Sequence, residues 1–272
     1  MKLPVADQSY QPTTESLIRA VKRAGAILAQ TVADETSLSS GATAFCTPGR
    51  PGVRFANLTT DLQVPESTCA SAVLDELVAH YDSQGVACLA LDGTQSTWPD
   101  ALAQAARQHG FEPTQKWLYR LERHRVPQRR NDAVQIIPAR AAYGQLPAFF
   151  RSMAHQGLGA DPKLASDLAG AWIDQLDEPR LELFLGRLNG RLVGVAGVVG
   201  LGQTGVICPA YTDANHRRQG IAAALTNHTL DHCGRALMQQ VILQRTARCP
   251  SVPFYESTGF KAIAPYVRYR RP

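Results

Sequence analysis

The chain has 272 residues, of which 44% are hydrophobic and 19% charged, a composition that excludes a disordered or fibrous protein. Its longest apolar run, residues 192–201, is about half of the ~20 residues that a membrane-spanning helix needs, and residues 1–7 lack the apolar core of a signal peptide. The net charge of +5 comes entirely from residues 131–272, which hold 15 basic and 10 acidic residues. We therefore expect a cytoplasmic protein whose C-terminal part is basic enough to bind an anionic ligand.

Residues 1–122 carry the apolar spacing and turn residues of an α/β protein. The predicted elements are a helix over 71–81, a strand over 86–91, a helix that starts at 98–99 and a strand at 117–119. Residues 123–132 follow, and they are polar, basic and without apolar periodicity. This pattern is typical of a solvated linker between two domains, 1–122 and 133–272. A nucleic-acid contact is the alternative interpretation.

Residues 133–272 predict a longer series of elements. Asp161 and Pro162 are an N-cap followed by proline at the first helical position, and Asn189-Gly190 is a strong hairpin signal. The predicted strands are 134–137, 181–188, 192–199, 206–211, 240–244 and 262–269, and the predicted helices are 146–157, one after Asp161, 219–233 and a short one through Tyr255. The order indicates a mixed α/β fold built in layers.

The end of the first half resembles the end of the second. A shift of 149 positions places Gly110-Phe111 on Gly259-Phe260 and Gly85 on Gly234, and the predicted helices and strands between them follow the same order. We interpret this agreement as an internal duplication.

The segment that carries the clearest chemistry is residues 215–222, which lies between a predicted strand and a predicted helix. Gly220 allows a tight turn and close approach of a ligand to the backbone. The N–H groups at the start of the helix, together with Arg217 and Arg218, can hold a pyrophosphate. The segment is neither a Walker A loop nor a GxGxxG motif.

Arg217-Arg218-Gln219-Gly220-Ile221-Ala222 resembles the Gln/Arg-x-x-Gly-x-Gly/Ala motif of the GNAT superfamily of N-acetyltransferases. Residues 253–260, with Tyr255 before Gly259-Phe260, resemble the second signature of that family. The resemblance covers residues 133–272, and residues 1–122 match as a degenerate copy. Tandem proteins of this family with one degenerate half are known, and the chain resembles one.

The resemblance implies a role for each matching residue. Residues 217–222 would bind the pyrophosphate of acetyl-CoA, and Thr212, on the strand before them, would offer backbone groups to the acetyl or pantetheine part. Tyr255 would protonate the departing thiolate.

Two positions depart from the family pattern. Arg248 stands where the family often has an Asn that contacts the pantetheine arm, so we expect Arg248 to reach a phosphate of the cofactor instead. The strand over 206–211 contains no carboxylate for a general base, which leaves Asp213, a water relay or a residue from the other half.

The first half lacks the residues that bind the cofactor. Thr68, Ser71 and Ala106 stand at the positions of Arg217, Gly220 and Tyr255 under the same shift, so we expect residues 1–122 to have a structural or substrate-shaping role. No metal site is expected, because His228 and His232 lack a third ligand and the six cysteines are scattered.

These observations favour an acetyl-CoA-dependent N-acetyltransferase, in which an amine attacks the thioester directly and backbone N–H groups hold the oxyanion. The acceptor would be a small-molecule amine or a peptide N-terminus. The rival hypotheses are a non-catalytic acyl-CoA-binding regulator and a nucleic-acid binder that uses the linker and Arg268, Arg270 and Arg271. Nucleic acid and membrane are not expected as partners.

Overall fold

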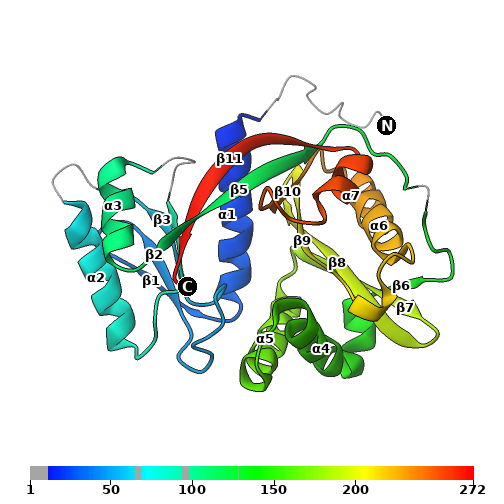
Figure 1. The fold of residues 1–272 in the computed structure, drawn as a ribbon, viewed down its shortest axis with the longest axis horizontal. Helices are drawn as coiled ribbons and strands as arrows, with labels where there is room; N and C mark the ends of the chain where they lie inside the picture. Colours follow the sequence, from blue (N-terminus) through cyan, green and yellow to red (C-terminus); the bar gives the residue numbers. More distant parts are fainter. Residues whose placement is uncertain (1–11, 65–68, 94–97, 128) are drawn as a thin grey trace, which may run out of the picture.

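The computed structural model describes residues 12–64, 69–93, 98–127 and 129–272. Residues 1–7 and Thr68, which were discussed above, lie outside these ranges. The described chain forms one sheet of 11 strands in the order β1-β2-β3-β4-β11-β5-β10-β9-β8-β7-β6, with helices on both faces (Figure 1). Within these ranges no helix is both long enough and apolar enough to cross a membrane.

The first half, which we define as residues 12–121, contains three helices and five strands among its described residues. They are α1 (Thr14–Gln30), β1 (Asp34–Ser37), β2 (Thr43–Cys46), β3 (Leu58–Leu62), α2 (Ala70–Ser83), β4 (Ala90–Gly93), α3 (Asp100–Gln108) and β5 (Glu112–Leu121). The predicted strand over 86–91 begins later than expected, because the N–H of Leu89 donates to the carbonyl of the buried Asn57 before the ladder with β3 starts.

The second half, residues 133–272, follows the predicted order. Its elements are β6 (Gln135–Pro138), α4 (Leu146–Leu158), α5 (Pro162–Asp174), β7 (Leu181–Leu188), β8 (Arg191–Leu201), β9 (Thr204–Thr212), α6 (Ile221–Arg235), β10 (Gln240–Arg245), α7 (Val252–Ser257) and β11 (Phe260–Arg270), with short 3-10 turns at 139–145, 175–177 and 214–216. The side chain of Asp161 caps α5 by accepting from the N–H of Leu164. Asn189 and Gly190 join β7 to β8 with φ angles of 50° and 78°, as a hairpin of this sequence requires. The mixed α/β fold is confirmed.

The two halves share one order of elements at a nearly constant offset. Moving α2, β4, α3 and β5 by 149 positions places them on or within a few residues of α6, β10, α7 and β11. The same shift brings α1 onto α5 and β3 onto β9. The repeat of predicted elements therefore extends further along the chain than the sequence pattern indicated.

The last strand of each half lies inside the sheet of the other half. β5 belongs to the first half but pairs with β10, and β11 belongs to the second half but pairs with β4. The two strands also pair with each other, from Phe260 opposite Leu121 to Arg270 opposite Glu112. Each half thus completes the sheet of the other, and Figure 1 shows these two strands crossing the centre of the molecule.

Helix α1 packs on the sheet of the second half. Its buried side chains Leu17, Ile18 and Val21 join a core cluster with Val206 of β9 and Ile242 of β10. Helices α6 and α7 pack on the opposite face, where Val241 and Leu243 alternate with Ile242 along β10. The part of the sheet that carries the candidate site is therefore fixed on both faces.

Candidate active site

The site lies where two parallel strands separate. β9 and β10 pair at three positions, from Gln240 opposite Thr204 to Ile242 opposite Val206. Past that point no pairing joins these two strands, although β9 continues to Thr212 and β10 to Arg245. The strands leave a gap with backbone N–H and C=O groups on both sides, and an extended chain that carries amides can bind there by strand-like hydrogen bonds.

The loop after β9 presents backbone donors to this gap. Arg218 and Gly220 have φ angles of 62° and 77°, which turn the chain sharply before α6. The N–H groups of residues 218–223 donate to no other described backbone group. They also lie at the positive end of a 15-residue helix. This arrangement is suited to an anion such as a phosphate.

The predicted binding residues surround these donors. Arg217, Arg218, Gln219 and Ala222 are exposed, whereas Ile221 is buried and anchors the helix in the core. The Nε of Arg217 donates to the carbonyl oxygen of Thr212 at 3.3 Å. Thr212 therefore ends β9 beside the loop, with its carbonyl already engaged by the arginine.

Gly220 has a contact that the sequence did not indicate. A Cβ at this position would lie 2.4 Å from the carbonyl oxygen of Arg129 and 2.8 Å from the nitrogen of Asn131. The N–H of Asn131 donates to the carbonyl of Gly220 at 3.4 Å. The glycine is thus required by the close approach of the linker, and the linker passes directly behind the phosphate-type loop.

Tyr255 lies in the core at the other wall of the gap. Its side chain is 4% exposed, and its ring meets Phe260 edge-on. Arg245, the last residue of β10, donates from Nη2 to the phenolic oxygen at 2.8 Å and lies 4.8 Å from the ring centre. Because the guanidinium occupies an acceptor position on this oxygen, the O–H remains able to donate.

Arg245 is the residue that sequence reasoning missed. It directly follows the predicted strand over 240–244, and its side-chain hydrogen bond to Tyr255, ten residues further on, is what the structure adds. Arg248 lies in the exposed turn after β10, and none of its side-chain contacts was found among the described residues. Its role stays a prediction.

Two titratable groups near Arg245 have shifted pKa values. Burial, followed by the charges of Arg270, Arg268 and Arg245, lowers the pKa of Lys116 to about 8. Burial alone would raise the pKa of Cys249, but a hydrogen bond with Ser251 and the charges of Arg245 and Lys116 lower it below its ordinary value. The end of β10 is therefore a strongly positive environment.

The candidate carboxylate Asp213 is already engaged. Its Oδ1 accepts from the N–H of Asn215 at 3.0 Å and lies 2.8 Å from Nδ1 of His216. The hydroxyl of Tyr211, a residue of β9 two positions before Asp213, is buried and lies near the backbone of Ala214. Burial and the charge of Asp213 raise the pKa of this phenol.

The paired histidines of α6 pack against an aromatic ring. His228 and His232 lie 4.6 and 5.3 Å from the ring centre of Phe184. Burial and the charge of Arg235 lower the pKa of His228. Among the described residues, no group of three or more His, Cys, Asp or Glu side chains is placed to hold a metal ion.

Comparison with known proteins identifies relatives of the fold. Residues 162–270 match the model of an acetyltransferase (GNAT) domain. A GCN5-related N-acetyltransferase from Kribbella flavida has a TM-score of 0.58 at 13% identity, covering 93% of this chain and 95% of that one. A functionally unknown conserved protein from Staphylococcus epidermidis has a TM-score of 0.56 at 14% identity, covering 88% and 94%. No protein with a curated description matches the sequence.

Proposed function

Because this chain belongs to the GNAT superfamily of acetyltransferases, we propose that its second half is an acetyl-CoA-dependent N-acetyltransferase. The observation that carries the proposal is the gap between β9 and β10, which ends at a loop whose backbone N–H groups are free to bind an anion. The match to the family model supports the family, and the likeness to solved structures supports the fold. The proposed activity rests on the site.

The residues present fit acetyl-CoA. The free N–H groups of 218–223 would hold the pyrophosphate, assisted by the exposed Arg217 and Arg218. The amides of the pantetheine arm match the groups of β9 that lie beyond its pairing with β10, and at Thr212 the arm would share the carbonyl with Arg217. Arg248, in the turn that follows β10, would meet an outer phosphate. Each group of the ligand thus faces a group of complementary chemistry.

Acetyl-CoA supplies a thioester carbonyl that an amine can attack and a thiolate that leaves. Tyr255 would donate its proton toward the leaving sulfur, because its O–H is not used by Arg245. Arg245 would keep the phenol oriented and stabilise the negative charge that the phenol gains as the proton moves. The acceptor is proposed to be a small-molecule amine or a peptide N-terminus.

We propose that the first half is a degenerate copy of the second. The shared order of elements supports a duplication, with domains over 1–122 and 133–272 and a linker over 123–132. Ala106, at the position of Tyr255, is fully buried and has no proton to give. One molecule of acetyl-CoA per chain is therefore expected.

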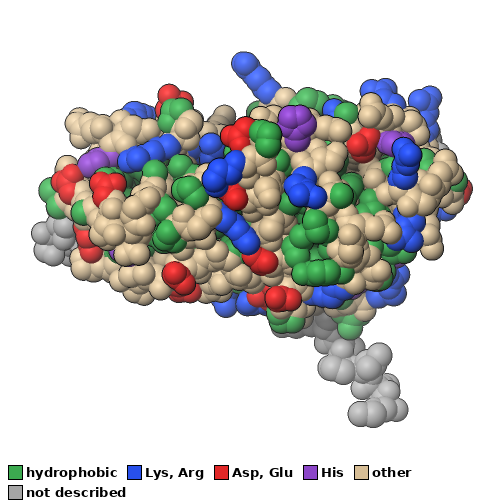
Figure 2. All heavy atoms as spheres, turned by 90° about the horizontal axis from the view of Figure 1, so that it is seen from below, with side chains coloured by type: hydrophobic (Ala, Val, Ile, Leu, Met, Phe, Trp, Pro, Cys, Tyr) green, Lys and Arg blue, Asp and Glu red, His purple; other side chains and the backbone are tan. Residues whose placement is uncertain are grey.

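A non-catalytic acyl-CoA-binding regulator is the second candidate. It is favoured by the sequences of β9 and β10, which contain no carboxylate that could accept the proton of the amine. A nucleic-acid binder receives less support, because basic and acidic side chains are interspersed over the face in Figure 2. Release of free thiol from acetyl-CoA with a panel of amines separates an enzyme from a regulator.

The test of cofactor binding must leave the linker undisturbed. A side chain at Gly220 would collide with Arg129, so we choose Ala222, which is exposed in the first turn of α6. Ala222→Glu places a carboxylate beside the pyrophosphate without harming the helix, because acidic residues are favourable at helix N-termini. Calorimetry should show affinity for acetyl-CoA lowered at least ~30-fold, or ~2 kcal/mol, by like-charge repulsion.

Ala72→Glu is the matched control. Ala72 is exposed in the first turn of α2, the counterpart of α6 in the first half, and the same carboxylate there should leave the affinity unchanged. Equal affinity in both variants and in the wild type would remove the assignment of the loop.

A further inference from the structure

A cavity lies between the two halves, away from the gap of β9 and β10. Its volume is about 830 Å³, within the range of small-molecule sites. One face of α1 and the end of β3 supply the wall from the first half, and the hairpin between β8 and β9 supplies the wall from the second half. The lining reaches Thr204, at the start of β9, whereas the phosphate-type loop follows Thr212 at its end, roughly 25 Å away for a strand of 9 residues.

The side of the cavity formed by α1 is positively charged. Arg19 and Arg23 lie one helical turn apart and are both exposed to the cavity. Neither has an ion pair in the described part of the chain. Two like charges at this spacing destabilise a helix by a few tenths of a kcal/mol, so the pair has a cost that an anionic ligand would offset.

Lys22 lines the same cavity and is buried, since only 7% of the residue is exposed. Its Nζ donates to the carbonyl of Gly93 at 2.6 Å, and burial lowers its pKa despite the nearby charge of Asp92. An anion in the cavity would therefore find a positive charge below it as well as along α1.

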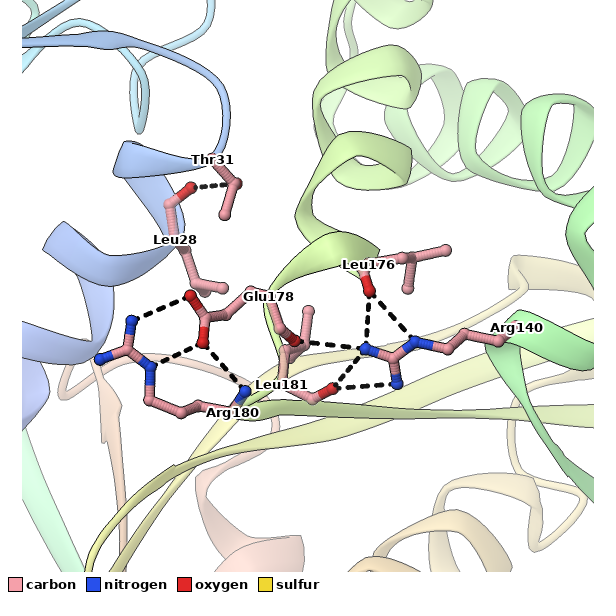
Figure 3. Close-up of polar contacts among 7 residues, drawn as sticks. All are labelled: Leu28, Thr31, Arg140, Leu176, Glu178, Arg180 and Leu181. Carbon is pink, nitrogen blue, oxygen red and sulfur yellow. Dashed lines mark hydrogen bonds and ion pairs between the residues drawn. The ribbon is translucent and has the colours of Figure 1, made fainter.

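The second half adds a guanidinium whose direction is fixed. Arg180 donates from Nε and Nη2 to the two carboxylate oxygens of Glu178, at 2.6 and 2.9 Å. Figure 3 shows this paired contact beside α1, with the third nitrogen of Arg180 outside it. Nη1 makes neither of these bonds, and Arg180 is one of the residues that line the cavity.

The acidic side chain in the lining is Asp61, which accepts from the hydroxyl of Thr60. Arg19, Lys22, Arg23 and Arg180 are the basic residues of the described lining, and among them Arg180 already has Glu178 as its counter-charge. We propose that the cavity binds a small molecule with at least two anionic oxygen groups, phosphate or carboxylate, held between the halves by Arg19, Arg23 and Arg180. Asp61 would accept a hydrogen bond from a hydroxyl or amine of the same molecule.

Calorimetric titration of the Ala222→Glu variant with inorganic pyrophosphate and with citrate, at constant ionic strength, tests the proposal, because the carboxylate added beside the loop keeps these anions out of the proposed pyrophosphate site. At least one probe should bind with a dissociation constant below about 1 mM. The probe that binds more tightly indicates whether the natural ligand carries phosphate or carboxylate groups. The double variant Arg19→Gln/Arg23→Gln should lose at least about tenfold in affinity, because two charge-assisted contacts are removed.

Two controls separate this cavity from other sites. Arg151→Gln removes one positive charge from an exposed position on α4, and its affinity should stay within about twofold. The Arg19, Arg23 and Arg151 variants are all made in the Ala222→Glu background, so that the loop is blocked in each of them. The proposal is overturned if neither probe binds or if the α1 double variant binds normally.

Discussion

The two parallel strand pairs of the molecule, β3 with β4 and β9 with β10, occupy equivalent places in the two halves and behave differently. The first pair stays joined to its end, where Leu62 pairs with Gly93 across a shift in register. The second pair stops at Val206 and Ile242 while both strands continue. The order of elements is therefore not sufficient for a binding gap, which also requires that the ladder end early.

The closed pair is held by contacts that the open pair lacks. The carbonyl of Gly93 accepts from Lys22 of α1, and the ring of Trp98 lies 3.3 Å from the place a Cβ of Gly93 would take. Next to it, Asp92 of β4 forms a buried ion pair with Arg268 of β11. The first half uses these positions to join α1, β4 and β11, whereas in the second half the pairing of β9 with β10 stops at Val206 and Ile242.

The largest expected effect comes from separating the halves. Residues 1–132 alone should show no cooperative thermal transition by circular dichroism, because β4 loses its partner β11. Mixing this fragment with residues 133–272 should restore a cooperative transition. A fragment that melts cooperatively by itself would show that the closed half does not depend on the open one.

The next effect is on the ion pair that closes the first half. Asp92→Asn should lower the free energy of unfolding by about 3–5 kcal/mol in chemical denaturation, because Asp92 is fully buried and its loss leaves the half-buried Arg268 without a counter-charge. The exposed pair of Arg130 and Asp132 is the control, and Asp132→Asn should cost less than about 1 kcal/mol. Equal losses in the two variants would contradict the role given to Asp92.

A smaller change is expected in the open half. Tyr255→Phe keeps the ring but removes its proton, and kcat should fall about 100-fold, or ~2.7 kcal/mol, with acetyl-CoA affinity within about threefold. The melting temperature should be followed in parallel, because Nη2 of Arg245 loses its acceptor. An unchanged kcat, with chemistry rate-limiting, would leave Tyr255 as a packing residue.

The smallest effect is a dependence of stability on pH. The pKa of Lys116 is about 8 in the folded chain against an ordinary value of 10.5, so the folded chain binds fewer protons than the unfolded chain between these values. Stability should therefore rise with pH across this window and level off below pH 8, where Lys116 is charged in both states. Lys116→Met should remove this rise in melting temperature, and an identical pH profile in the variant would contradict the shift.

Local signals predicted most of the second half. Asp161 before Pro162, Asn189 before Gly190 and the apolar periods of the strands act within a few residues, so the elements form where the sequence pattern places them. The loop around Gly220 was also located, because its residue types match a known motif.

What the sequence did not predict depends on contacts between distant segments. In the exchange of β5 and β11, each strand pairs with a strand more than a hundred residues away in the sequence. Neither strand has a residue pattern that identifies its partner. The passage of the linker behind Gly220 is a second contact of this kind, since residues 129–131 meet a glycine about 90 positions later. The hydrogen bond of Arg245 to Tyr255 spans a turn and a short helix, and no local pattern marks it. The opening between β9 and β10 likewise depends on the residue at which their pairing stops, and no local sequence pattern predicts that residue.

The exchange of β5 and β11 also bears on how the protein is made. β11 begins at Phe260 and β4 ends at Gly93, so β4 waits for its partner through the synthesis of about 170 residues. Until then β4 presents a bare edge that another nascent chain can pair with. The eleven residues of β11 thus join the sheets of both halves in one step, and a chain whose synthesis stops before β11 holds two unfinished sheets instead of one.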